Sequence, residues 1–126
     1  MSGKIIFSII ESASHPQLSG LYSRLGLKEV KLLSMREAMK KLKKQSPDFV
    51  MAEFFYGYGN NYAGVNLSNL DVFLSSLQKY APQARVLVIA DKVDCDHITR
   101  LGELFDIDTV FFRPVSEQQV SDALAQ

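Results

Sequence analysis

Short apolar runs alternate along the chain with stretches in which apolar residues recur every three or four positions. Runs rich in β-branched and aromatic residues predict strands, because these side chains pack well on a pleated surface. Apolar residues fill nearly every position of most runs, so we expect both faces of the strands to be covered, as in a parallel sheet. Five such strands are predicted: Lys4–Ile10, Glu29–Leu33, Phe49–Ala52, Arg85–Ala90 and Thr109–Phe112.

Helical patterns fill the intervals between these strands. Ser34–Glu37 and Ser116–Gln119 have the spacing of capping boxes and mark the start of two helices. Three further helices are predicted over Pro16–Leu25, Leu67–Tyr80 and His97–Phe105, the last with Asp94 or Asp96 as its N-cap.

Five strands alternating with five helices predict an α/β fold. The expected architecture is a (βα)5 doubly wound parallel five-stranded sheet in a flavodoxin-like three-layer sandwich. Functional sites of such sheets form at the carboxyl ends of the strands. The candidate positions are therefore Ile9–Ser12, Glu53–Tyr58, Ala90–Lys92 and Arg113.

Composition narrows the class of protein. The 126 residues fit one domain, 1–126, and 14 basic residues balance 14 acidic ones, so we expect no direct nucleic-acid binding. The one cysteine, Cys95, has no internal partner, which fits a reducing compartment. No apolar run is long enough to span a bilayer and no signal peptide is evident, so we expect a cytoplasmic protein without membrane contact.

Two stretches carry a family resemblance. Pro47–Glu53 (PDFVMAE) and Thr109–Pro114 (TVFFRP) resemble the receiver domains of two-component response regulators, the CheY-like family. In that family Pro-Asp and apolar residues precede the phosphoacceptor aspartate, and Lys-Pro follows the fifth strand. The resemblance spans nearly the whole chain. It implies a CheY-like fold and a role in signalling.

The side chains of receiver chemistry are nevertheless replaced. The family binds Mg²⁺ through an acid pair after the first strand and through the phosphoacceptor, and a Ser or Thr and a Lys hold the phosphoryl group. Aliphatic side chains offer no oxygen to Mg²⁺, and a glutamate carries its oxygens about one C–C bond further out than an aspartate. We therefore predict a pseudo-receiver without phosphotransfer, enzymatic activity, metal or cofactor. The replaced positions are Ile9 and Ile10, followed by Glu11, then Glu53, Ala90 and Arg113.

Two interpretations of Glu53 and Arg113 remain open. Arg113 meeting Glu53 through two parallel hydrogen bonds would imitate a phosphoryl group held by a cation and lock one conformation. Alternatively, the two residues merely satisfy each other or solvent at the rim of a disused pocket. A loss of stability or of partner binding in Arg113→Ala separates the two.

An aromatic, Gly- and Asn-rich loop follows the third strand over residues 54–66. We expect Phe54 and Phe55 to fill the core over Ile9 and Ile10, and Tyr58 and Tyr62 to contact a partner. Asp94–His97 is interpreted as capping and solvated residues rather than a metal cluster.

The leading functional hypothesis is a receiver-like regulatory module that acts through protein–protein contacts. The partner is unknown, and a homodimer is one possibility. The alternatives are a flavodoxin-like module that binds a nucleotide or flavin, and the N-terminal receiver-like part of a longer regulator. The resemblance implies a contact surface on the fourth helix, fifth strand and fifth helix, with Arg100, Glu103, Phe111 and Gln118.

Overall fold

The computed structural model describes residues 3–56 and 68–125. All ten predicted elements are present, with one additional short 3-10 helix. In chain order they are β1 (Ile5–Ile9), α1 (Ser19–Arg24), β2 (Lys28–Leu32), α2 (Met35–Leu42), β3 (Phe49–Glu53), α3 (Asp71–Tyr80), β4 (Arg85–Ala90), η1 (Lys92–Asp94), α4 (Cys95–Leu104), β5 (Thr109–Phe112) and α5 (Glu117–Leu124).

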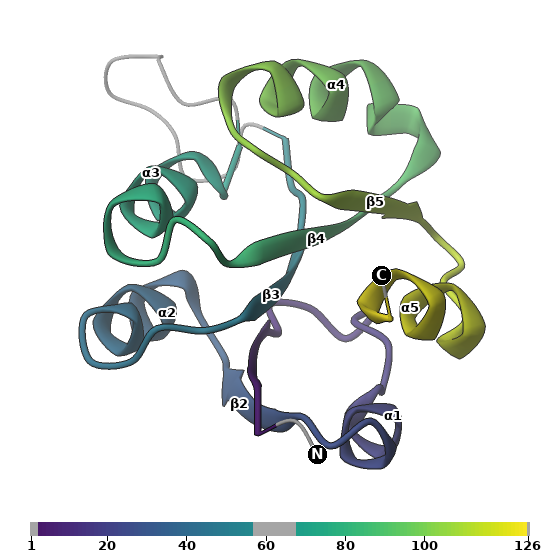
Figure 1. Cartoon of the computed structure of the whole chain (residues 1–126). Helices are drawn as coiled ribbons and strands as arrows, with labels where there is room; N and C mark the ends of the chain where they lie inside the picture. Colours follow the sequence, from purple (N-terminus) through teal and green to yellow (C-terminus); the bar gives the residue numbers. More distant parts are fainter. Residues whose placement is uncertain (1–2, 57–67, 126) are drawn as a thin grey trace.

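The five strands form one parallel sheet in the order β2-β1-β3-β4-β5 (Figure 1). The chain starts at β1, adds β2 on one side and then adds β3, β4 and β5 on the other. This reversal places a crevice at the carboxyl ends of β1 and β3. The predicted doubly wound, flavodoxin-like and CheY-like fold class is confirmed.

Helices cover both faces of the sheet (Figure 1). Helices α1 and α5 pack on one face over a core that includes Ile6, Met51 and Ile89. Helices α2, α3 and α4 pack on the other face over a core that includes Phe7 and Val88. Alternate residues of one strand enter opposite cores, which explains why the central strands are apolar at almost every position. None of the described helices is long and apolar enough to cross a membrane.

Three helices begin later or earlier than their apolar patterns predict. Helix α1 begins at Ser19 rather than Pro16, so the chain from Ile10 to Leu18 is a loop. Helix α3 begins at Asp71 rather than Leu67. Ser68 precedes the helix, and its N–H and its hydroxyl both donate to the Asp71 carboxylate. Helix α4 begins at Cys95, two residues early, because η1 leads into it.

The N-terminal caps define the starts of the remaining two α-helices, α2 and α5. At α5 the capping box of Ser116 and Gln119 is complete, as predicted. At α2 only half of the box forms: Ser34 Oγ accepts the Glu37 N–H, but the Glu37 carboxylate accepts the N–H of Leu33 instead of Ser34. At α4 the N-cap position is occupied by Asp94, one of the two predicted residues, but its side chain makes no capping hydrogen bond.

Candidate functional site

Glu53 lies at the centre of the crevice, at the last position of β3, and is fully buried. Its Oε2 atom accepts the N–H of Glu11 at 2.9 Å, the N–H of Ser12 at 3.2 Å and the Nδ1–H of His15 at 3.0 Å. Its Oε1 atom accepts the Ser12 hydroxyl and, at 3.1 Å, Nη2 of Arg113. Three donors therefore surround one oxygen and two the other.

These donors hold the Glu53 carboxylate in its charged form. Burial alone would raise the pKa of Glu53, but hydrogen bonds from His15, Ser12 and the Glu11 N–H outweigh it and lower the pKa from 4.5 to about 2. A carboxylate only accepts hydrogen bonds, so His15 must carry its proton on Nδ1. Glu53 is thus a buried anion at neutral pH inside a ring of donors.

Arg113 follows β5 and divides its guanidinium between two acids. Nη2 donates to Glu53, and Nη1 donates to Asp91 at 3.1 Å. The predicted pairing of Glu53 with Arg113 is present. The two parallel bonds to one carboxylate that the locked interpretation requires do not form, because Asp91, just after β4, accepts the second arm. Nε of Arg113 is buried and has no partner among the described residues.

Glu11 forms a second connection across the crevice. Its Oε1 atom accepts the side-chain amide of Asn69 at 2.7 Å, and the same amide nitrogen donates to the Glu53 carbonyl at 2.8 Å. Burial raises the pKa of Glu11, the bond from Asn69 lowers it, and the negative charge of Glu53 raises it further. Asn69 also accepts the N–H of Phe55, so it joins the loop after β1 to the end of β3.

The apolar replacements lie where the sequence predicted, at the ends of β1 and β4. Ile9 and Ala90 are fully buried, and Ile10 is half-buried on the opposite face from Ile9. Phe54 is buried in the same core as Ile9, as predicted, whereas Phe55 remains partly exposed. The apolar side chains therefore form only one wall of the crevice. The carboxylates of Glu53 and Glu11 belong to its other walls.

The residues predicted for a contact surface divide into three groups. Arg100 and Glu103 on α4 and Gln118 on α5 are exposed. Phe111 was predicted to belong to the contact surface, but its ring is buried in the core beneath α1 and α5. Its position on β5 faces that side of the sheet. Tyr58 and Tyr62 lie outside the described residues.

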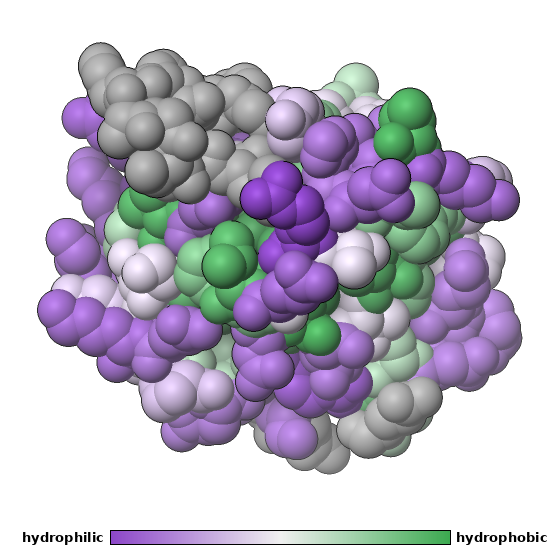
Figure 2. Space-filling model, turned by 90° about the horizontal axis from the view of Figure 1, so that it is seen from above, coloured by the Kyte–Doolittle hydropathy of each residue, from purple (hydrophilic) through white to green (hydrophobic). Residues whose placement is uncertain are grey.

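The surface above α4 is mixed rather than continuously apolar. Figure 2 shows hydrophilic residues interrupting separate hydrophobic ones on this face. Val93 before α4 is 86% exposed, and Leu104 at its end is 61% exposed. Tyr56 stacks on His97 with ring centroids 3.7 Å apart, which joins the end of the β3 segment to α4.

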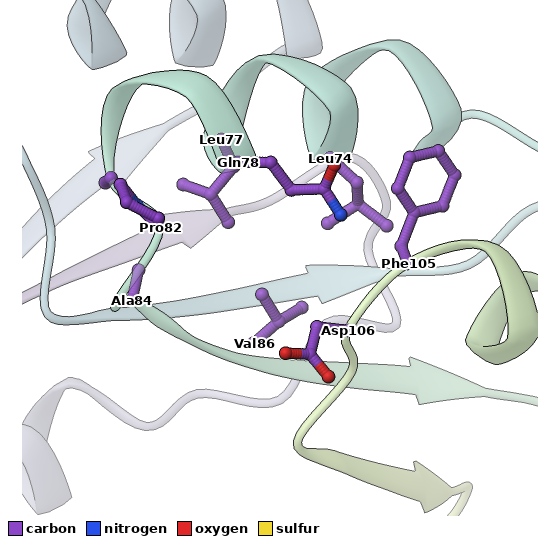
Figure 3. Close-up of a pocket in the computed structure, with 9 residues that line it drawn as sticks. Leu74, Leu77, Gln78, Pro82, Ala84, Val86, Phe105 and Asp106 are labelled. Atoms are coloured by element: carbon purple, nitrogen blue, oxygen red, sulfur yellow. The ribbon is translucent and has the colours of Figure 1, made fainter.

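Two other features of the described residues bear on chemistry. No group of three or more His, Cys, Asp or Glu side chains is arranged there to hold a metal ion. Between α3 and the start of β4 lies a pocket lined by Leu74, Leu77 and Phe105 (Figure 3). Its volume of about 20 Å³ fits about one water molecule, and its lining lacks the crevice residues, so we assign it no function.

Several solved structures of response-regulator receivers have the same arrangement of strands and helices. A receiver-domain protein from Clostridium thermocellum matches with a TM-score of 0.69 and 20% identity, over 97% of this chain and 91% of that one. Chemotaxis protein CheY4 of Vibrio cholerae matches with a TM-score of 0.73 and 13% identity, over 98% of both chains. This chain has the receiver fold. No protein-family model matches the sequence, and neither does any curated protein.

A third receiver gives the chemical contrast. A response regulator from Burkholderia pseudomallei matches with a TM-score of 0.68 and 19% identity, over 96% of this chain and 66% of that one. That structure contains a phosphorylated aspartic acid and a calcium ion. In the receiver fold described here, the crevice holds Glu53 with its ring of protein donors.

Ser12 falls within the predicted candidate range Ile9–Ser12 and contacts Glu53. Two other polar partners of the crevice, His15 and Asn69, are not among the predicted site residues. His15 belongs to the loop after β1, and Asn69 lies inside the predicted helix Leu67–Tyr80. Their one detectable signal is position: a polar loop after a buried parallel strand lies at the functional edge of the sheet. His15 is buried, which is unusual for a loop residue beside proline and marks it as part of the site.

Proposed function

We propose that this chain is a receiver-like regulatory module that is not phosphorylated and acts through protein–protein contacts. The observation that supports it is the occupied carboxylate of Glu53. A phosphoacceptor must present a free oxygen for in-line attack and share it with a divalent cation. Both oxygens of Glu53 already accept hydrogen bonds, three on one and two on the other.

The donors around Glu53 supply what a phosphoryl group would otherwise recruit. Arg113 neutralises the carboxylate from β5, and His15 fixes it to the loop after β1. A negative charge held between the ends of β3 and β5 is the arrangement that phosphorylation creates in a working receiver. The module is thus built in one fixed state, and its regulation has to come from partner availability or from ligands.

The alternative of a nucleotide or flavin site has less support. Phosphate groups bind where backbone N–H groups or cations are free. Here the N–H groups of Glu11 and Ser12 donate to Glu53, and the Arg113 guanidinium is divided between Glu53 and Asp91. A phosphate at these strand ends would face two carboxylates instead.

Phosphorylation chemistry tests the first half of the proposal directly. The protein is incubated with acetyl phosphate and Mg²⁺, and its intact mass is measured, with a phosphorylatable CheY-type receiver as the positive control. We expect no phosphoryl adduct. Beryllofluoride with Mg²⁺ is added in a parallel NMR experiment and should leave the amide signals of Ser12, Glu53 and Arg113 unchanged. An adduct on the chain or saturable shifts at these amides would overturn the proposal.

The second half concerns the contact surface on α4 and α5. We propose that Arg100, Glu103 and Gln118 contribute to it, in a homodimer or with another protein. Sedimentation of the wild type and of the charge reversal Glu103→Arg tests the dimer. A concentration-dependent dimer that the reversal weakens would support this surface, and a dimer unaffected by it would place the contact elsewhere.

A further inference from the structure

A second polar cluster joins β1, β2 and α1 on the face of the sheet that α1 covers. Ser8 Oγ donates to Glu29 Oε2 at 2.7 Å, and Ser19 Oγ donates to Glu29 Oε1 at 2.6 Å. Ile6 is opposite Glu29 and Ser8 is opposite Lys31 in the strand register, so Ser8, Glu29 and Lys31 share this face. Neither serine donates to Glu53, so the cluster is separate from the crevice contacts.

A pocket of about 90 Å³ opens beside this cluster, and its volume equals that of about three water molecules in the liquid. It is large enough for a small organic group. Leu18 and Ile10 give it an apolar side, and Lys31, which is exposed, lies among the lining residues. The polar lining residues include His15, Ser19, Tyr22 and Glu29.

The wall offers more acceptors than donors. Both serine hydroxyls donate their hydrogens to Glu29, and their oxygen lone pairs can still accept hydrogen bonds. The Glu29 oxygens can also accept further hydrogen bonds. The Tyr22 hydroxyl is buried and has no hydrogen-bond partner among the described residues. Burial and the Glu29 charge raise the pKa of Tyr22, with a smaller opposing effect from the neighbouring Ser8, so it stays neutral. Apart from Lys31, the formal charge of the cluster is therefore negative.

We propose that this pocket binds a small protonated primary amine. Its ammonium hydrogens are donated to the Glu29 carboxylate and to the hydroxyl oxygens around it, and a short aliphatic stem lies against Leu18 and Ile10. Charge-assisted bonds to the carboxylate supply most of the affinity. Lys31 opposes the ligand only weakly, since it is exposed and solvent screens its charge.

His15 couples the pocket to the crevice. Its ring lines the pocket, while its Nδ1–H donates to Glu53. Its Nε2 atom has no hydrogen-bond partner within the described ranges 3–56 and 68–125. An amine bound here thus reaches the Glu53 carboxylate through one imidazole ring, and this coupling, unlike the binding itself, rests on the proposed function.

The binding is tested by NMR titration of the ¹⁵N-labelled protein with methylammonium chloride. Tetramethylammonium chloride at equal ionic strength is the control, because it carries the same charge without an N–H donor. We expect saturable shifts at the Ser8, Ser19 and Glu29 amides with methylammonium only. The dissociation constant should be about 10 mM or weaker, given the ceiling on affinity for a ligand of two heavy atoms. Identical, unsaturated shifts with both salts would overturn the proposal.

Four variants localise the site. Glu29→Gln should weaken binding about tenfold through loss of the charge-assisted bonds, and Ser19→Ala should weaken it severalfold while keeping the carboxylate. Lys31→Gln should tighten binding about twofold by removing the like charge. Asp106→Asn, at an exposed acid between α4 and β5, should leave it unchanged. Equal affinities in Glu29→Gln and Asp106→Asn would refute the site.

The coupling has its own readout. Saturating methylammonium should move the ¹³C signal of the Glu53 carboxylate and the ring nitrogen signals of His15. Binding without these shifts would overturn the coupling and leave the amine site standing. Neither outcome bears on phosphorylation, which the acetyl phosphate experiment tests separately.

Discussion

Replacing Glu53 by glutamine removes one buried negative charge and leaves the side chain nearly the same size. The new amide has one oxygen to accept hydrogen bonds, and its NH₂ group has to face donors instead. Whichever way the amide turns, it confronts either the Ser12 hydroxyl and Arg113, or the two backbone N–H groups and His15. Arg113 also loses its buried counter-charge.

The magnitude follows from the pKa of Glu53. A pKa that is 4.5 in the unfolded chain and about 2 in the folded one corresponds to about 3 kcal/mol of stability at neutral pH. Loss of one partner from a buried ion pair has a typical cost of the same size. Because the folded pKa is depressed, this stability is fully present above the unfolded pKa and is lost as the pH falls toward about 2. At pH 3 about half of it should remain.

Urea unfolding at pH 7 and pH 3, followed by far-ultraviolet circular dichroism, measures this directly, and the chain has no tryptophan to serve as a probe. We expect Glu53→Gln to be less stable than the wild type by about 3 kcal/mol at pH 7 and about 1.5 kcal/mol at pH 3. The control Asp106→Asn, at an exposed acid, should stay within about 0.5 kcal/mol. The pKa of Glu11 is raised by burial and in part by the Glu53 charge, and Glu11 titrates with the opposite sign, so the loss of that charge in Glu53→Gln offsets a part of the difference. A difference below about 1 kcal/mol at pH 7, or one independent of pH, would refute the reasoning.

The other stability predictions use the same unfolding measurement. Arg113→Met should lose about 3 kcal/mol because it removes the salt-bridge partner of the buried Glu53 carboxylate. Asp91→Asn should lose less than about 1 kcal/mol because the Asp91 carboxylate is 57% exposed; equal losses would contradict the division of the guanidinium between a buried and an exposed acid. Asn69→Ala should lose about 2 kcal/mol, since its buried amide connects the loop after β1 to the end of β3, and a loss under about 0.5 kcal/mol would show that this connection is dispensable. Tyr22→Phe should be neutral or stabilising by up to about 1 kcal/mol, because the hydroxyl it removes is buried without a partner; a clear destabilisation would reveal an unrecognised hydrogen bond.

The fold was predictable because its signals are repeated. Each strand is short and apolar on both faces, each crossover contains a helix, and the alternation admits few arrangements. The helix starts were less predictable where a tertiary contact competes with the local pattern. The Pro16–Leu18 segment fits a helix by spacing, but the loop before it is held by Glu53, and the helix begins only at Ser19.

The site was predictable in part for the same reason. Glu53 and Arg113 sit at strand ends, so the topology alone brings them together. Ser12 and His15 sit in a loop whose conformation no periodicity specifies, and their contacts depend on where the loop turns. The choice of Asp91 as second partner of Arg113 likewise depends on side-chain geometry, which a pattern of residue types does not contain.

The shared anchoring of Glu53 has a consequence for any attempt to make this protein phosphorylatable. An aspartate at position 53 would withdraw its oxygens from donors that span the loop after β1 and the end of β5. The stranded imidazole and guanidinium would then compete with the incoming metal for the same space. Gain of phosphorylation therefore requires several coordinated substitutions, and every single-step intermediate is expected to be less stable than the starting protein. No single substitution is therefore expected to convert the present arrangement into a phosphorylatable site.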